Sequence, residues 1–202
     1  MEAFNVLTGI AAPLPAANVD TDVIMPKQFL KGIDRNGLDR GVFFDLRFLA
    51  DGSPDPAFIL NQPEWQNAKF LLVGPNFGCG SSREHAVWGL KQLGIRALIG
   101  TTFAGIFFDN CQRNGVLTVQ LDPKPWAQIA QEVVHGDKNK ITLDLPAQRI
   151  GLQNGEVIDF AIDELSKVSL LNGLDAIGTT LQYRDDIREF QQGHLQRNPW
   201  LA

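Results

Sequence analysis

The stretch that decides the fold runs from Ala68 to Leu90 and reads AKFLLVGPNFGCGSSREHAVWGL. The apolar run at 68–74 is typical of a strand that is buried on both faces of a parallel sheet. A loop with two glycines follows, and the apolar spacing then predicts a helix from Ser82 to about Leu93. A buried strand, a loop and a helix in this order are the first half of a β-α-β unit.

The same alternation continues downstream. The segment IRALIG (95–100) predicts a second buried strand, and FAGIFFDNCQRNG (103–115) predicts a helix that ends near Gly115. VLTVQL (116–121) predicts a third strand. Strands that alternate with helices form parallel sheets with right-handed crossovers, so the fold class is α/β.

The remaining segments predict additions to this sheet. A proline-opened amphipathic helix is expected at 123–136, and a helix capped by Asp163 should end at Gly173. KITLDLPAQRI (140–150) and EVIDFAID (156–163), separated by Asn154-Gly155, read as antiparallel strands. We therefore expect one domain over 1–202, with a mostly parallel central sheet and a small antiparallel portion.

The two ends of the chain are less regular. The part before about residue 65 is rich in loops, with one short strand expected at Val23–Met25. Long ordered loops in a compact domain are often functional. The tail at about 181–202 is polar and predicted to be helical, and we expect its last residues to be disordered without a partner.

Composition excludes several classes of partner. The net charge is −5 with no block of like charge, which argues against nucleic acid, because phosphate binding needs clustered basic residues. Hydrophobic residues make up 44% of the 202 residues, enough for a core. The N-terminus lacks a basic region, and no apolar run approaches the roughly 20 residues of a membrane span. We expect a cytoplasmic protein with no membrane partner.

Only two cysteines occur, Cys79 and Cys111, and neither lies in a CxxC or a Cys/His cluster. Reduced thiols are therefore more plausible than a disulfide framework. A four-iron cluster usually takes at least three thiolates from its protein. We expect no metal ligands in this chain.

The loop between the first predicted strand and helix has the features of an anion site. Helix N-termini present unsatisfied N–H groups and a positive dipole end. Gly78 and Gly80 allow close approach of the backbone to a ligand, and Arg83 can pair with a carboxylate through two N–H groups. The expected ligand is a small carboxylate or phosphate.

The same letters also fit a purely structural interpretation. Ser81 and Glu84 have the S-x-x-E spacing of a capping box, in which the glycines simply form the turn. His85 alone is more often packed than catalytic, and Cys79 is a candidate nucleophile without an evident base. The local pattern does not choose between a cap and an anion site. No phosphate-binding GxxxxGK[ST] or hydrolase GxSxG occurs.

Four segments resemble one family. NFGCGSSREHA (76–86), NVDTDVIMPKQFL (18–30) and FAGIFFDNCQRNGVL (103–117) are similar to the motifs of the swivelling β/β/α domain of the aconitase superfamily. LNGLDAIGTTLQYRDDIREFQ (171–191) resembles the small subunits of bacterial 3-isopropylmalate dehydratases. The segments occur in the family's order and span most of the chain.

The resemblance implies an enzyme of leucine biosynthesis, a hydro-lyase that isomerises 2-isopropylmalate to 3-isopropylmalate through isopropylmaleate. It implies that Ser81 abstracts the substrate proton and that Ser82 and Arg83 hold a carboxylate of the dicarboxylate substrate. It further implies a large-subunit partner that supplies a [4Fe-4S] cluster, so that this chain binds no cofactor itself.

Other positions follow from the same resemblance. The loop KQFLKGIDRNG is expected to sense the substrate's substituent, with Phe29 and Leu30 toward an isopropyl group and Lys27 or Lys31 toward a carboxylate, although all four also fit packing or solvent exposure. The Asp20–Asp22 segment is expected to form a turn network. Gly105 replaces the family's usual acidic residue, and we expect that difference to be structural.

Alternatives remain open at this stage. The same chemistry on citraconate/2-methylmalate or homoaconitate is a close one. An anion-binding assembly module and a Cys79-dependent hydrolase are more distant ones.

Overall fold

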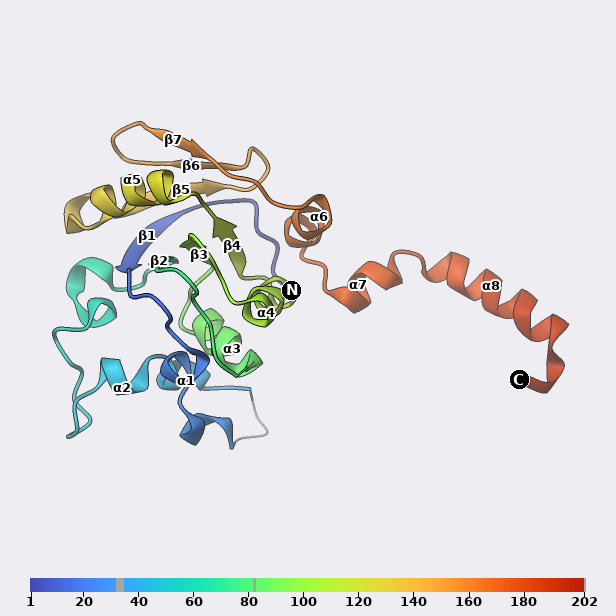
Figure 1. Cartoon of the computed structure of the whole chain (residues 1–202). Coiled ribbons are helices and arrows are strands. Elements are labelled where there is room, and N and C mark those ends of the chain that lie inside the picture. Colours follow the sequence, from blue (N-terminus) through green and yellow to red (C-terminus); the bar gives the residue numbers. More distant parts are fainter. Residues whose placement is uncertain (32–34, 82, 202) are drawn as a thin grey trace.

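A computed structural model describes residues 1–31, 35–81 and 83–201. The described strands form one seven-stranded sheet in the order β4-β3-β2-β1-β5-β6-β7 (Figure 1). The central strand is β1 (Val6–Leu14), which joins a parallel half to an antiparallel half. The mixed sheet with flanking helices confirms the predicted α/β class.

The parallel half consists of β1, β2 (Phe70–Val73), β3 (Ala97–Gly100) and β4 (Leu117–Gln120). The helices between them are α3 (Glu84–Gln92) and α4 (Gly105–Asn114). Strands β2 and β3 are buried at every position, as their apolar runs predict. Helix α4 ends as predicted at Gly115, which has a positive φ of 77°.

Two apolar cores lie on opposite faces of this sheet because successive side chains of a strand alternate in direction. Leu71 and Val73 belong to the core under α3 and α4. Phe70 and Leu72 belong to the other core, which α5 (Pro123–Val133) covers through Ile129 and Val133. The parallel strands are therefore sandwiched between two layers.

The antiparallel half contains β5 (Lys140–Asp144), β6 (Arg149–Gly151) and β7 (Val157–Asp159). The sequence predicted a single strand over 140–150, but a turn at 145–148 divides it, with Gln148 at a positive φ of 56°. Leu145 remains buried within this turn, which explains why its apolar side chain read as part of a strand. Helix α6 (Glu164–Asn172) is capped by Asp163 and ends at Gly173, as predicted.

The N-terminal part differs most from the expectation. The sequence did not predict β1, and the residues expected to form a strand at Val23–Met25 instead belong mainly to α1 (Thr21–Ile24). The β1 sequence VLTGIAAPL contains glycine, alanines and a proline, which are poor strand formers in isolation. Pairing on both sides of β1 overrides these weak local preferences.

The other elements before β2 are short. They are α2 (Phe44–Arg47) and the 3₁₀ turns η1 (Lys27–Leu30), η2 (Leu38–Gly41), η3 (Ile59–Asn61) and η4 (Pro63–Trp65). This part of the chain is therefore ordered through turns, in agreement with its predicted loop content. The later 3₁₀ turns are η5 (Gly136–Lys138) and η6 (Pro199–Leu201).

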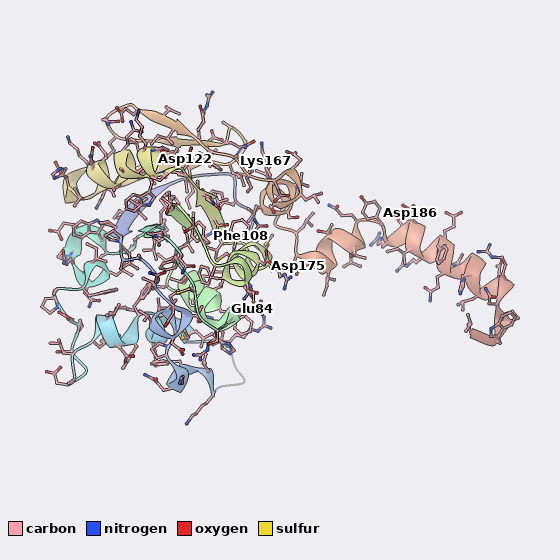
Figure 2. All side chains as sticks on the ribbon, in the orientation of Figure 1. Glu84, Phe108, Asp122, Lys167, Asp175 and Asp186 are labelled. Atoms are coloured by element: carbon pink, nitrogen blue, oxygen red, sulfur yellow. The ribbon has the colours of Figure 1, made fainter. Side chains whose placement is uncertain are left out.

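Residues 176–201 form a C-terminal arm that projects from the rest of the chain, called the body below (Figure 1). It contains α7 (Ala176–Leu181) and α8 (Arg184–Arg197), which confirms the predicted helical tail. In Figure 2, the side chains of the arm around Asp186 lie away from the body. Among the described residues, no helix has the length and apolar character needed to cross a bilayer.

Candidate active site

The glycine-containing loop between β2 and α3, called the candidate catalytic loop below, lies against the connection between β1 and α1. Asp20 and Cys79 form a parallel β-bridge, and the N–H of Thr21 donates to the carbonyl of Cys79 at 2.9 Å. The N–H of Gly78 donates to the carbonyl of Val19 at 2.8 Å. Two segments that the sequence singled out separately are therefore joined by their backbones.

Side chains of Asp20, Thr21 and Asp22 perform three different tasks at this junction. Asp20 caps α1 by accepting from the N–H of Val23 at 2.8 Å. The Thr21 hydroxyl donates to the carbonyl of Ser81, and Asp22 forms an ion pair with Arg83. Of the expected local turn network, only the Asp20 bond is present, because Thr21 and Asp22 reach across to the candidate catalytic loop.

The Asp22–Arg83 ion pair is the feature of the candidate site that the sequence interpretation missed. Arg83 keeps 18% of its side chain exposed and Asp22 keeps 42%. One guanidinium nitrogen, Nη1, contacts Asp22. A guanidinium has five N–H donors, so this contact with Asp22 uses only part of its hydrogen-bonding capacity. The sequence does show a carboxylate in one motif and a guanidinium in another, which could have suggested an ion pair. Only the fold shows that the two groups meet.

The start of helix α3 contradicts the predicted capping box. The described helix begins at Glu84, its N-cap is Arg83, and the Arg83 side chain makes no capping hydrogen bond. The Glu84 carboxylate accepts from Asn114 at 2.8 Å and does not reach back toward Ser81. Ser81 is exposed at this end of α3, and Ser82 lies outside the described residues.

The two glycines have different surroundings. Gly78 is buried at a φ of 77°, and a Cβ at this position would overlap the ring of Phe107. Gly80 is exposed at a φ of 85°, where a Cβ would lie 3.2 Å from the Cβ of Asp20. The open backbone at Gly80 fits the predicted approach of a ligand, whereas Gly78 makes room for the side chain of α4.

The histidine and cysteines of this region have structural surroundings. His85 packs on Trp88 with ring centroids 4.7 Å apart, and Arg35 lies 4.0 Å from the same Trp88 ring. Burial raises the pKa of the Cys111 thiol well above its usual value, so this thiol stays protonated. Cys79 is half-buried and unpaired in any disulfide.

The predicted specificity residues separate into two pairs. Phe29 and Leu30 are partly buried against the core that lies under α3 and α4. The ring centroids of Phe29 and Phe44 are 5.0 Å apart. Lys27 and Lys31 are exposed. Lys27 borders a hollow of about 340 Å³ that Asp22, Pro26, Gln28 and Asp45 also line. The hollow thus adjoins the carboxylate that holds Arg83.

Gly105 is the first residue of α4, and a Cβ there would meet nothing within 4 Å. A side chain at this position would therefore start in open space, with no packing contact at its Cβ.

Two family models match the chain. The model described as the aconitase C-terminal domain matches residues 1–124, which include every residue of the loop described above. The second model, described as the C-terminal domain of the 3-isopropylmalate dehydratase small subunit, matches residues 177–202, which form most of the arm.

Curated relatives cover the chain almost from end to end. The 3-isopropylmalate dehydratase small subunit 1 of Mannheimia succiniciproducens is 62% identical over 100% of this chain and 99% of its own length. The small subunit 2 of Salmonella typhimurium is 61% identical over 100% of this chain and 96% of its own length. The small subunit of Agrobacterium fabrum is 47% identical over 99% of this chain and all of its own length.

A solved structure shares the fold. The crystal structure of a 3-isopropylmalate dehydratase from Methanocaldococcus jannaschii superposes with a TM-score of 0.66 at 25% identity. The match covers 92% of this chain and 99% of that one.

Proposed function

The chain belongs to the family of 3-isopropylmalate dehydratase small subunits, and we propose that its Ser81 and Arg83 form this subunit's half of the active site. The activity is that of a hydro-lyase in leucine biosynthesis. The observation that supports the assignment of residues is the junction of Ser81 and Arg83 with the Thr21–Asp22 segment, since both motifs of the family meet there.

Ser81 is assigned as the base. Dehydration of 2-isopropylmalate removes the hydroxyl group from one carbon and a proton from its neighbour, which leaves a double bond between them. Rehydration adds them the other way round, with the hydroxyl group on the carbon that lost the proton and a proton on the carbon that lost the hydroxyl group. Ser81 lies at an exposed position before the N-terminus of α3, where the helix dipole favours a negative charge on its hydroxyl group. Its carbonyl is held by Thr21, which fixes the backbone that carries the base.

Arg83 is assigned as the carboxylate holder. Its pair with Asp22 orients the guanidinium before substrate arrives, and the N–H groups that do not face Asp22 can bind a substrate carboxylate. Ser82 is proposed to hold the same carboxylate, and Gly80 to admit it close to the backbone. Lys27, at the neighbouring hollow, is the second cation proposed to attract the dicarboxylate. Phe29 and Leu30 remain proposals for contacts with the isopropyl substituent, and Lys31 is the alternative to Lys27 for the carboxylate.

The departing hydroxyl group needs a Lewis acid, and the described residues of this chain do not fit one. The described residues contain no group of three or more His, Cys, Asp or Glu side chains arranged for a metal ion. We therefore assign the [4Fe-4S] cluster to a large subunit, as the name of the family implies a second chain. With two free thiols, the chain is proposed to work in the reducing cytoplasm.

The arm is proposed to contact that large subunit. Tyr183, Ile187 and Phe190 are spaced four and three residues apart, so they form one apolar stripe on the helix, and their exposed fractions are 60%, 45% and 67%. The matching family model is named for the small subunit, whereas the model for the body is named for a domain of aconitase. The arm is therefore the segment specific to a separate small subunit.

The test is reconstitution with a cluster-bearing large subunit of the family. The chain alone should show no isomerase activity, and the mixture should convert 2-isopropylmalate to 3-isopropylmalate. Relative kcat/KM for isopropylmalate, 2-methylmalate and homoaconitate would separate the close alternatives. Full activity of the large subunit without this chain would contradict the proposal.

A further inference from the structure

The last residue of α4, Asn114, contacts three residues of α3. Its Nδ2 donates to the Glu84 carboxylate at 2.8 Å, and its Oδ1 accepts from the Trp88 indole nitrogen at 2.9 Å. Its main-chain carbonyl accepts from the Lys91 ammonium at 2.8 Å. Glu84, Trp88 and Lys91 are spaced four and three residues apart, so they lie on one face of α3.

These contacts require an amide at position 114. A carboxylate can only accept a hydrogen bond and an indole N–H can only donate one. The side chain between Glu84 and Trp88 must therefore carry both a donor and an acceptor, as asparagine does. The Asn114 amide also donates to the carbonyl of Asn110 at 2.8 Å, which fixes its orientation on α4.

Helix α4 also contacts the chain on the other side of the candidate catalytic loop. Phe107 precedes Asn114 by two turns and therefore lies on a similar face of α4. It packs where Gly78 lacks a Cβ, and its ring meets that of Phe77 edge-on at 5.6 Å. Phe107 thus contacts the residues before Ser81, and Asn114 contacts the residue directly after Arg83.

From this arrangement we propose that Asn114 is a positioning residue for Ser81 and Arg83. It acts through Glu84, because the carboxylate of Glu84 fixes the first residue of α3 and so the direction in which Arg83 leaves the helix. Phe107 holds the opposite end of the same loop. The inference rests on the proposed function, since it assigns a purpose to the geometry of that loop.

The test is a double-mutant cycle in the assembly with a large subunit. Asn114→Asp keeps the acceptor for Trp88 but places a carboxylate against Glu84, and we expect kcat/KM to fall at least about tenfold. Glu84→Gln alone keeps an acceptor for Asn114 but loses the charge, and its kcat/KM is the second single-variant value of the cycle. When both substitutions are combined, the amide introduced on α3 can donate to the carboxylate introduced on α4.

The double variant should therefore recover at least about threefold of the kcat/KM lost in Asn114→Asp, although the bond to the Asn110 carbonyl is not restored. Because the restored hydrogen bond would also restore stability, kcat/KM is compared per folded chain, with folding measured by circular dichroism. A role limited to stability predicts equal values per folded chain for all four proteins. A double variant as impaired as Asn114→Asp would overturn the inference. Wild-type activity of Asn114→Asp would do the same.

Hydrogen exchange of the isolated chain gives a second measurement that does not depend on activity. Asn114→Asp should speed exchange at the amides flanking Ser81 and at the first turn of α3, with the amides of β2 and β3 unchanged. Equal exchange at the loop in both proteins would overturn the inference. If the unchanged chain fails to support isomerase activity with any large subunit, the proposed function fails instead.

Discussion

The backbone of Gly78 lies so close to Phe107 that a single methyl group on Gly78 would overlap the aromatic ring. Gly78 also has a φ of 77°, which side-chain-bearing residues rarely adopt. The first glycine of the 76–86 motif is therefore fixed by packing from α4 and by its own backbone angle.

Gly78→Ala should consequently destabilise the fold by about 2 kcal/mol or more, because overlap and backbone strain add. Gly105→Ala is the matched control, since a Cβ there meets nothing within 4 Å and Gly105 lies in a helix. The control should unfold at the same denaturant concentration or slightly higher. Denaturant unfolding followed by circular dichroism measures both, and equal midpoints would refute the packing argument.

Ser81→Ala should lower kcat of the reconstituted enzyme by roughly 10² to 10⁴, the usual contribution of a general base. Its KM should change little, since the substrate carboxylate contacts other groups. Cys79→Ser is the control in the same loop and should remain active within a few-fold. Steady-state kinetics decide the outcome. A heavy loss in Cys79→Ser with an active Ser81→Ala would favour the hydrolase alternative.

Arg83→Lys should reduce kcat/KM by about 10- to 100-fold, because an ammonium cannot serve Asp22 and a substrate carboxylate with two separate edges. Asp22→Asn should have a smaller effect in the same direction, since the guanidinium keeps its charge but loses the ion pair that orients it. Both variants should still bind the large subunit. Near-normal kinetics of Arg83→Lys would remove this residue from the carboxylate site.

Removal of residues 176–202 should leave the body folded, because the cap of α6 at Gly173 and its hydrogen bond to the N-terminus of Met1 are retained. The truncated chain should bind a large subunit at least about tenfold more weakly, as apolar anchors dominate interface energies. The substitution of Tyr183, Ile187 and Phe190 by Ser in the full chain provides a matched test. Unchanged affinity in calorimetry would remove the arm from the interface.

Asp163 should make the stability of α6 depend on pH. The Ser166 hydroxyl and the helix N–H groups lower the pKa of this carboxyl. Its stabilising effect is therefore complete above its unfolded pKa of about 3.9 and declines as the pH falls through the lower folded value.

Asp163→Asn should retain the cap without that pH dependence, whereas Asp163→Ala should lose about 0.5–2 kcal/mol at neutral pH. Unfolding midpoints measured from pH 3 to pH 7 compare the three chains. The same acid sensitivity in the asparagine variant would assign the effect to another carboxyl group.

Sequence patterns predicted the parts of this molecule that depend on local composition. The buried runs at β2 and β3, the αL glycine that ends α4 and the aspartate that caps α6 all lie where the patterns place them. Strand β1 was missed because its small residues have weak strand propensity and gain their structure from two neighbours.

The candidate site shows the same division. The family resemblance selected Ser81 and Arg83, but the S-x-x-E spacing predicted a capping box that the structure does not form. Glu84 finds its partner in Asn114, which is 30 positions away along the chain. Arg83 likewise pairs with Asp22 across 61 positions. Such partners depend on tertiary packing and are invisible to local periodicity.

The central position of β1 also has a consequence for the order in which the chain folds during synthesis. The ribosome makes β1 first, yet its antiparallel neighbour β5 follows only after the whole parallel half has been translated. One edge of β1 is therefore unpaired for most of translation, and its closure has a high contact order. An exposed strand edge is prone to aggregation, and pairing with β5 is what covers this edge of β1 in the folded subunit.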